Sequence, residues 1–211
     1  MRLLTLSDIE SPFIYNNRIR KRFADVSVAI SCGDLKVYYL EYVISMLNIP
    51  LYYVLGNHAT SEEIGASEPR LNPWGAINLH KKSIYNKKHK LLLSGIEGSL
   101  RYNEGRHQYS QLEMWAMALG LVPKFILNKA RYGRYLDIFV THASPWKIHD
   151  DTDRAHQGIK AFLWLDKIFQ PQLHLHGHIH LYNRYQPHQT LLGKTRIINT
   201  YGFRELDFPF K

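Results

Sequence analysis

The stretch Leu173-His174-Leu175-His176-Gly177-His178-Ile179-His180 constrains the fold more than any other part of this sequence. Its first half is a short apolar run, which predicts a buried strand over Leu173–Leu175. Two histidines, His178 and His180, follow directly after that strand. Neutral imidazole is a common metal ligand in proteins. The stretch therefore predicts a buried strand that ends in metal-binding side chains.

The same arrangement, an apolar run followed by metal-binding side chains, occurs at four more places along the chain. The four motifs are Ser7-Asp8-Ile9-Glu10, Cys32-Gly33-Asp34, Gly56-Asn57-His58 and His142-Ala143-Ser144-Pro145. The carboxyl ends of parallel strands meet at one edge of a sheet, and ligands bind in the crevice outside that edge. We therefore expect side chains that are far apart in the sequence to converge there. They are Asp8, Asp34, Asn57, His142, His178 and His180.

Buried strands alternate with helical patterns along the chain. The strands are predicted at Arg2–Leu6, Val26–Ser31, Leu51–Val54, Leu91–Ser94, Leu136–Thr141 and Leu173–Leu175. Apolar residues at helical spacing predict helices at Val37–Leu47, Gln111–Leu121 and Ile159–Phe169. This alternation indicates a layered α/β protein with mostly parallel strands, whose sheets are covered on both faces. The turn-rich stretch Ala59–Asn78 is expected to be an irregular excursion within the same domain.

Composition limits the class of protein. A chain of 211 residues corresponds to about one domain, so we expect a single domain over residues 1–211. Hydrophobic residues make up 45% and charged residues 21%, which excludes disorder as the main state. No apolar run approaches the roughly 18 residues that a membrane helix needs, and the first residues are too short for a secretory signal. The single cysteine, Cys32, excludes a disulfide within the chain and fits a reducing, cytoplasmic location.

The chemistry of the expected cluster is that of a two-metal site. Carboxylates and imidazoles with one amide oxygen suit Mn, Fe or Zn rather than a soft thiolate-bound metal. Two such ions about 4 Å apart can activate a water and stabilise an in-line displacement. The chain carries 27 Lys and Arg against 18 Asp and Glu, a formal charge of +9. A basic protein with this site favours phosphate as the electrophile, although the charge is equally explained as a solubilising surface.

The five motifs together resemble those of the calcineurin-like metallophosphoesterases. In order they read Asp-x-Glu, Gly-Asp, Gly-Asn-His, Thr-His and Gly-His-Ile-His, and they span Asp8 to His180. The segments Gly98–Tyr102 and Thr141–Pro145 further resemble small stand-alone bacterial members. The resemblance implies a four-layer α/β/β/α sandwich, in which two mixed sheets are flanked by helices.

The resemblance also implies a dinuclear centre and a role for each motif residue. The implied ligands are Asp8 and His180 for the first ion, Asn57, His142 and His178 for the second, and Asp34 as the bridge between the two. By the same resemblance, His58 would protonate the leaving group or steady the phosphate. His58 and Asp34 are therefore the expected catalytic residues.

Two positions depart from the pattern of that family. Glu10 stands where the family usually has histidine. We expect Glu10 to bind a metal ion, and the added carboxylate favours Mn over Zn, with Fe as a further candidate. The alternative is that Glu10 points away and one ion is held weakly. Ala59 stands where the family often has an acid that orients the histidine, so His58 would be held by a backbone carbonyl or another carboxylate.

Several further residues have both a functional and a structural interpretation. Arg101 could bind a substrate phosphate, or it could be a solvated surface arginine. His156 is expected to line the cleft, because its segment follows the His142 loop. His174 and His176 share one strand face and are expected to be hydrogen-bonded packing residues or to support the ligands, rather than to be ligands themselves. Cys32 is expected to be a buried packing residue.

Three functions fit these patterns. The leading expectation is a metal-dependent phosphoesterase acting on a small phosphate ester, a nucleotide among the candidates, by in-line attack of a metal-bridging hydroxide. The lack of a large cap insertion favours a phosphodiester. The second is a nuclease with the same dinuclear site, which the positive charge supports. The third is a non-catalytic interaction module that has kept the fold.

The basic clusters carry less information than the metal motifs. Arg18–Arg22 and Lys87–Lys90 lack the regular aromatic interleaving of a single-strand binding platform, so nucleic acid is not the favoured partner. The sequence contains neither a P-loop nor a Gly-x-Ser-x-Gly element, which leaves nucleotide hydrolysis by a P-loop and serine hydrolysis without support. No pattern points to a membrane partner or to a particular oligomeric state.

Overall fold

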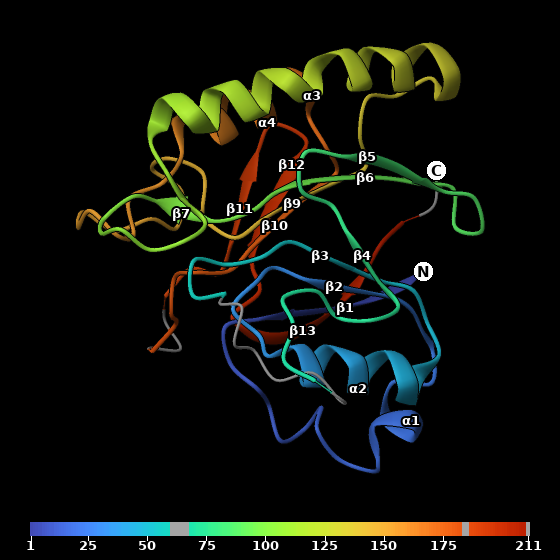
Figure 1. Cartoon of the computed structure of the whole chain (residues 1–211). Coiled ribbons are helices and arrows are strands. Elements are labelled where there is room, and N and C mark those ends of the chain that lie inside the picture. The colour runs from blue at the N-terminus through green and yellow to red at the C-terminus, as the bar shows by residue number, and fades with distance from the viewer. Residues whose placement is uncertain (60–67, 183–185, 210–211) are drawn as a thin grey trace.

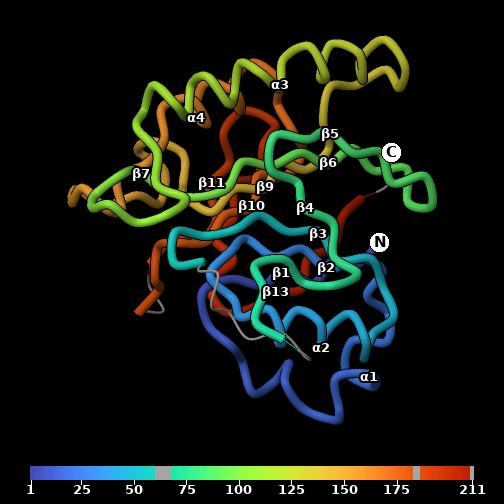
Figure 2. Tube along the Cα trace, viewed as in Figure 1, coloured from blue at the N-terminus to red at the C-terminus, as the bar shows by residue number. Residues whose placement is uncertain are grey.

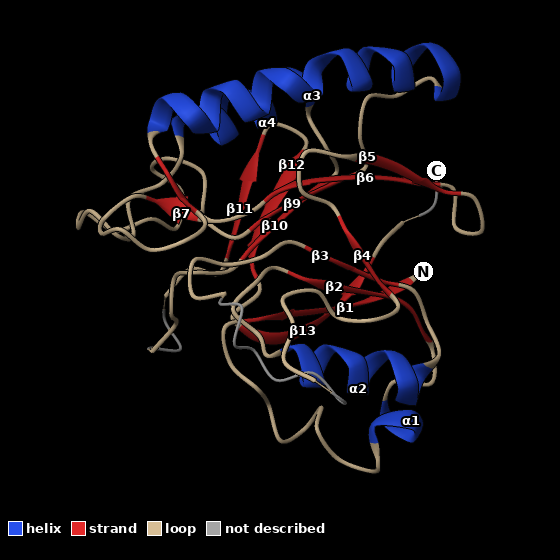
Figure 3. Cartoon of the chain, viewed as in Figure 1, coloured by secondary structure: helices blue, strands red, loops and turns tan. Residues whose placement is uncertain are grey.

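Two mixed β-sheets stacked face to face form the centre of the molecule (Figures 1 and 3). The computed structural model describes residues 1–59, 68–182 and 186–209. The five-stranded sheet has the order β13 (Gly202–Asp207), β1 (Arg2–Ser7), β2 (Val26–Ser31), β3 (Leu51–Tyr53) and β4 (Ala76–Asn78). The six-stranded sheet has the order β11 (Gln189–Leu192), β12 (Thr195–Asn199), β10 (Leu173–His176), β9 (Ile138–Thr141), β6 (Leu91–Ile96) and β5 (Ser83–Asn86).

Most strands run parallel, as the sequence predicts. Strands β1 to β4 are parallel, and so are β12, β10, β9 and β6, whereas β13, β11 and β5 are antiparallel edge strands. A short parallel pair, β7 (Ser99–Leu100) with β8 (Gln108–Tyr109), lies beyond the end of β6. Figure 2 shows the C-terminal strand β13, in red, beside the N-terminal β1, in blue. The last described strand thus forms one edge of the five-stranded sheet.

Helices cover the outer face of each sheet and complete a four-layer α/β/β/α sandwich. Helices α1 (Ile19–Arg22) and α2 (Val37–Leu47) lie under the five-stranded sheet, while α3 (Gln111–Tyr132) and α4 (Lys160–Phe169) lie over the six-stranded one (Figure 1). Between the sheets, fully buried Val28, Val140 and Leu175 belong to one apolar cluster. Burying a side chain of this size contributes about 1.5–3 kcal/mol. The four-layer architecture expected from the motifs is confirmed.

The predicted elements match closely in the strands and less well in one helix. The strand Val26–Ser31 and the helix Val37–Leu47 have their predicted limits. Helix α3 was expected to end at Leu121, but it continues through Pro123 to Tyr132, because its buried face continues with Phe125. Its start is fixed by a capping box between Ser110 and Glu113. Part of the predicted excursion 59–78, residues 60–67, lies outside the described residues.

The carboxyl ends of the parallel strands of both sheets meet on one side of the molecule. The backbone N–H of Gly98, after β6, donates to the carbonyl of Leu55, after β3, at 3.0 Å. The N–H of Gly177, after β10, donates to the carbonyl of His142, after β9, at 3.0 Å. None of the helices in the described part of the chain has the length and apolar character needed to cross a membrane.

Candidate metal centre

Three of the predicted ligands lie at strand ends where the backbone takes a strained conformation. Asp8 follows β1, Asp34 lies beyond β2, and His178 follows β10, with φ angles of 66°, 54° and 65°. Non-glycine residues rarely adopt the left-handed region, and such strain concentrates at functional sites. The chain therefore turns at these three residues instead of continuing the strands.

Two glycines allow the chain to approach these carboxylates. A Cβ on Gly56 would collide with the Asp34 carboxylate, and a Cβ on Gly177 would collide with the Ser7 hydroxyl and come within 2.7 Å of Asp8 Oδ2. Only glycine fits at either position. The glycines of the Gly-Asn-His and Gly-His-Ile-His motifs are therefore required by close packing against the site.

Asp8, Asp34 and His142 form the centre of the site. Each offers one ligand atom, and these atoms lie within 4.8 Å of one another. No other group of three such side chains is found in residues 1–59, 68–182 and 186–209. His142 Nε2 lies 3.1 Å from Asp34 Oδ2 and 2.9 Å from Asn57 Oδ1. The structure thus brings four of the predicted ligands together.

The hydrogen bonds around His142 show that this cluster suits a cation. His142 Nδ1 donates to the carbonyl of Cys32 at 2.8 Å, so Nε2 is the nitrogen that faces the site. Its two neighbours there, Asp34 Oδ2 and Asn57 Oδ1, are both acceptors. The Asn57 amide is fixed in this orientation because its Nδ2 donates to the Tyr102 hydroxyl at 3.0 Å. Three acceptor atoms in contact need a positive charge between them.

The pKa values of these groups express the same demand. Burial alone would lower the pKa of His142, but the charge and hydrogen bond of Asp34, with Asp8, raise it to about 9. Burial would raise the pKa of Asp34, but the His142 imidazole and the backbone N–H of His58 hold it well below its usual range. Without a metal, a proton on His142 supplies the positive charge. A divalent ion can replace that proton, so the residues present fit a metal.

His178 is held in the form that binds metals. Its ring Nε2 donates to the carbonyl of Ala155 at 2.8 Å, which leaves Nδ1 with a free lone pair. Burial, and then the neighbouring His142, lower the pKa of His178 to about 3, so the ring is neutral at pH 7. Its backbone N–H donates to Asp8 Oδ1 at 3.0 Å. The centroids of the His142 and His178 rings lie 4.8 Å apart.

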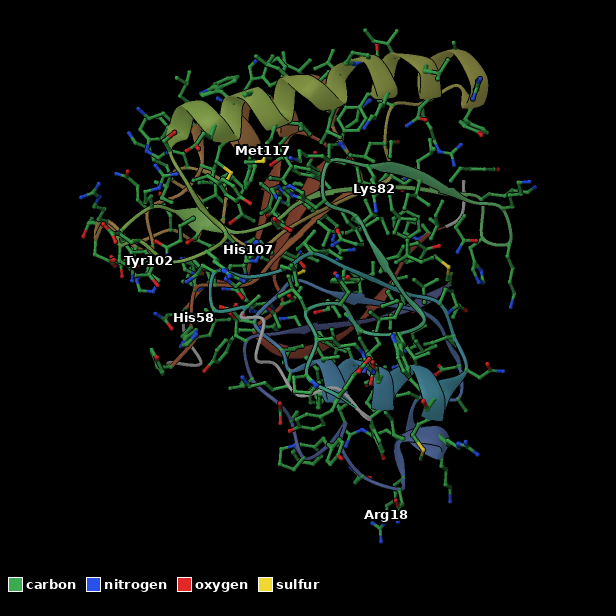
Figure 4. The ribbon with its side chains drawn as sticks, in the orientation of Figure 1. Arg18, His58, Lys82, Tyr102, His107 and Met117 are labelled. Atoms are coloured by element: carbon green, nitrogen blue, oxygen red, sulfur yellow. The ribbon has the colours of Figure 1, made fainter. Side chains whose placement is uncertain are left out.

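His58 and His180 lie at the exposed rim of the site. The backbone N–H of His58 donates to Asp34 Oδ1 at 3.0 Å, while its side chain is exposed. His180 Nδ1 lies 2.8 Å from the Tyr182 hydroxyl, and its ring lies 4.8 Å from that of Tyr201. Figure 4 shows His58 and Tyr102 on the same side of the two sheets. The catalytic role of His58 and the ligand role of His180 stay predictions.

Glu10 is exposed and takes part in a different contact. The Tyr38 hydroxyl donates to Glu10 Oε2, and this hydrogen bond raises the pKa of Tyr38 to about 12. Glu10 is not among the three side chains that offer ligand atoms within 4.8 Å of one another. Tyr38 occupies one oxygen of the Glu10 carboxylate, and a ligand role for Glu10 stays a prediction.

The two predicted substrate residues lie in different surroundings. His156 borders the centre, because its ring lies 5.0 Å from that of His178, and its Nδ1 lies 2.8 Å from Asp153 Oδ2. Arg101 pairs with Glu113 at the start of α3, 3.0 Å between Nη2 and Oε2, and is half exposed. Substrate binding by either residue stays a prediction.

Comparison with known proteins gives the family. Residues 1–182 match the family model described as calcineurin-like phosphoesterase. The chain belongs to the calcineurin-like phosphoesterase family. Membership implies a metal-dependent phosphoesterase in general, with divalent metal ions, and Asp8, Asp34 and His142 form a group able to hold one. No significant match was found among curated proteins.

One of the similar solved structures supports the fold. One is 15% identical with a TM-score of 0.65, covering 98% of this chain and 94% of the other. GAP50, described as the anchor in the inner membrane complex of Plasmodium, is 14% identical with a TM-score of 0.48, covering 94% and 70%. Vacuolar protein sorting 29 from Cryptosporidium parvum is 10% identical with a TM-score of 0.43, covering 94% and 72%. The first of these shows the shared fold.

Proposed function

We propose that this protein is a dinuclear, metal-dependent phosphoesterase that hydrolyses a phosphodiester. One observation carries the proposal. Asp34 Oδ2 and Asn57 Oδ1 both lie about 3 Å from His142 Nε2, in a chain of the calcineurin-like phosphoesterase family. A chain that had lost the chemistry would have no need to keep this cation-demanding cluster.

The residues divide between two ion positions. Asp8 and His180 would hold one ion, Asn57, His142 and His178 the other, and Asp34 would bridge them. When bound, the ions supply Lewis acidity and a water of lowered pKa for in-line attack at phosphorus. Oxygen ligands from Asp8, Asp34 and, once released from Tyr38, Glu10 favour Mn over Zn.

The chain's own groups orient the ligands and handle the leaving group. The Cys32 and Ala155 carbonyls fix the ring orientation of His142 and His178, and the N–H of His58 fixes the Asp34 carboxylate. The exposed imidazole of His58 donates a proton to the departing oxygen. The open rim around His58 and His156 supports a diester, because both substituents of the phosphorus need room.

The experiment combines metal analysis with a substrate panel. The purified chain is saturated with Mn²⁺, its metal content is measured, and phosphomonoesters, phosphodiesters and cyclic nucleotides are assayed. We expect two ions per chain and the highest kcat/KM on a diester. The Asp34→Asn variant should lose both, whereas Asp25→Asn, an exposed acid paired with Arg2, should behave like wild type. Full metal content without hydrolysis of any ester would favour a non-catalytic module.

A nuclease is the second candidate, favoured by a largely apolar groove beside α1 that three cationic residues line. The groove has a volume of about 860 Å³ and is lined by Pro12, Phe13, Asn16, Asn17, Arg18, Lys21 and Arg22. Phe13 is 59% exposed, and no described carboxylate forms an ion pair with Arg18 or Lys21. Figure 4 shows Arg18 extending away from the surface.

Salt dependence separates the two candidates. Polynucleotide hydrolysis that falls steeply between about 50 and 200 mM salt would favour the nuclease, because each phosphate contact releases counterions. In Arg18→Glu/Lys21→Glu the rate at low salt should then be lower and its dependence on salt shallower. The matched control is Lys87→Glu/Lys88→Glu, in the other basic cluster. A small phosphodiester should show no such dependence.

A further inference from the structure

A line of three buried side chains lies behind His142. They come from three elements: Thr141 from β9, His174 from β10 and Asp166 from α4. Thr141 Oγ1 lies 2.8 Å from His174 Nε2, and His174 Nδ1 lies 2.7 Å from Asp166 Oδ2. All three residues are fully buried. None of them belongs to the predicted ligand set.

Donors and acceptors can be assigned along this line from one end. Thr141 Oγ1 lies 2.7 Å from the carbonyl of Ala143, and a carbonyl only accepts, so the hydroxyl donates there. A hydroxyl has one proton, so Thr141 must accept from His174, and His174 Nε2 must carry a hydrogen. A second proton is then shared between His174 Nδ1 and Asp166. From His174 onward the hydrogen bonds have one direction, through the Thr141 hydroxyl to the Ala143 carbonyl.

The far end of this chain brackets His142. Thr141 and Ala143 are its two neighbours, and their hydrogen bond closes a tight turn across it. The carbonyl of His142 accepts from Gly177 N–H at 3.0 Å, and the ring is held by the Cys32 carbonyl. The backbone from which His142 projects is thus fixed on both sides.

Stability alone does not account for the pair of His174 and Asp166. Asp166 Oδ1 has no hydrogen-bond partner, and burial raises the pKa of this carboxyl, so the pair carries an uncompensated polar atom. Well-packed apolar residues are often neutral or stabilising in place of a buried ion pair. A positioning role gives this costly arrangement a reason.

We propose that Asp166, His174 and Thr141 are positioning residues that fix the backbone of His142 and thereby aim its Nε2 at the metal ion. The proposal rests on the metal site of the proposed function. Partners that orient ligands in this way typically change metal affinity by about 10- to 100-fold when they are removed.

The first test measures Mn²⁺ affinity by calorimetry. Thr141→Val keeps the shape and removes the hydroxyl, and we expect about 10- to 100-fold weaker binding. Thr141→Ser, which restores the hydroxyl, should bind within about threefold of wild type. The matched control is Ser94→Ala on β6, a buried hydroxyl that donates to the Lys82 carbonyl at 2.7 Å. It should lower the Tm comparably and leave the affinity unchanged.

A second measurement does not depend on metal. Nitrogen-15 NMR of the metal-free chain should show His174 with a hydrogen on Nε2 in wild type. In Asp166→Leu the protonation of the His174 ring should differ, because Nδ1 has lost its partner. Wild-type Mn²⁺ affinity in Thr141→Val would overturn the positioning role. Failure of wild type to bind any Mn²⁺ would instead contradict the proposed function. A His174 without a hydrogen on Nε2 would overturn the assigned hydrogen bonds between His174, Thr141 and Ala143, whether or not metal binds.

Discussion

Two pairs of histidines, His142 with His178 and His149 with His176, lie near the strand ends and differ in what faces their rings. In the metal centre, His142 Nε2 faces the oxygens of Asp34 and Asn57. In the second pair, His149 Nδ1 lies 2.9 Å from His176 Nε2, and the remaining nitrogens contact the Thr190 hydroxyl and the Gly177 carbonyl. No carboxylate within the described residues forms an ion pair with the second pair.

Burial lowers the pKa of His142 and of His149 alike, but only at His142 do neighbouring carboxylates reverse the effect. The pKa of His142 is raised to about 9 because carboxylates outweigh the effect of burial. The pKa of His149 is lowered to about 4, mainly by burial and then by His174 and His188, against the pull of Asp150. His176 is lowered well below its ordinary pKa for the same leading reason. The carboxylates, and not the histidines, decide which pair keeps a positive charge.

Removing the central carboxylate should erase this difference, and it has the largest expected effect. In Asp34→Asn, the pKa of His142 should fall steeply from about 9, because burial is then opposed only by Asp8 and the Cys32 carbonyl. Bound Mn²⁺ should fall to background. NMR titration of the metal-free chain measures the pKa of His142, and elemental analysis measures the bound Mn²⁺. A His142 that still titrates near pH 9 would show that Asp34 is not the controlling charge.

Crowding the same carboxylate should have the next largest effect. Gly56→Ala places a methyl group against the Asp34 carboxylate, so the Asp34 loop must shift and Mn²⁺ binding should weaken by at least about tenfold. Gly120→Ala is the control, since nothing lies within 4 Å of that added Cβ and helical alanine is more stable by about 0.5–1 kcal/mol. Equal Mn²⁺ affinity in both variants would refute the packing argument.

Strand ends in the sequence predicted much of this site. Asp34, Asn57 and His142 come together because parallel strands share an edge. The partners that orient them left no trace in the sequence. Tyr102 lies 45 positions from Asn57, and the holding groups at Cys32 and Ala155 are carbonyls, which every residue has.

The fold was predictable where strands are buried on both faces and less so elsewhere. The edge strands β5 and β11 are only partly buried and have no continuous apolar run. Strand β13 is largely half-buried and contains Arg204 and Glu205, so its pairing with β1 depends on the fold and not on its own pattern. Short strands such as β7 depend on tertiary pairing in the same way.

Glu10 tests whether a third carboxylate joins the centre. If it binds, Glu10→Ala should reduce the metal content at saturating Mn²⁺ from two ions per chain to one. Tyr38→Phe is the sharper variant, because it removes the hydrogen bond that competes with a metal ion for the Glu10 carboxylate and should strengthen Mn²⁺ binding by a few fold. Two ions per chain in wild type and in Glu10→Ala would show that Glu10 is dispensable.

The smallest expected effect concerns the second pair and acid. An imidazole in the unfolded chain has a pKa of about 6.5, whereas folded His149 has a pKa of about 4. Between these values the unfolded chain binds more protons, so the free energy of unfolding should fall as the pH drops from about 6.5 to about 4. His149 should contribute nothing to the slope above that window.

His149→Asn cannot titrate there, and asparagine tolerates the left-handed backbone of this position, where φ is 59°. The variant should therefore be less stable at pH 7 but lose less stability on acidification. Urea unfolding of the metal-free chain at pH 7, 6 and 5 measures the slope. Parallel slopes for wild type and His149→Asn would mean that the pKa of His149 is not lowered in the folded chain. The contrast between His149 and His142 would then be wrong for His149.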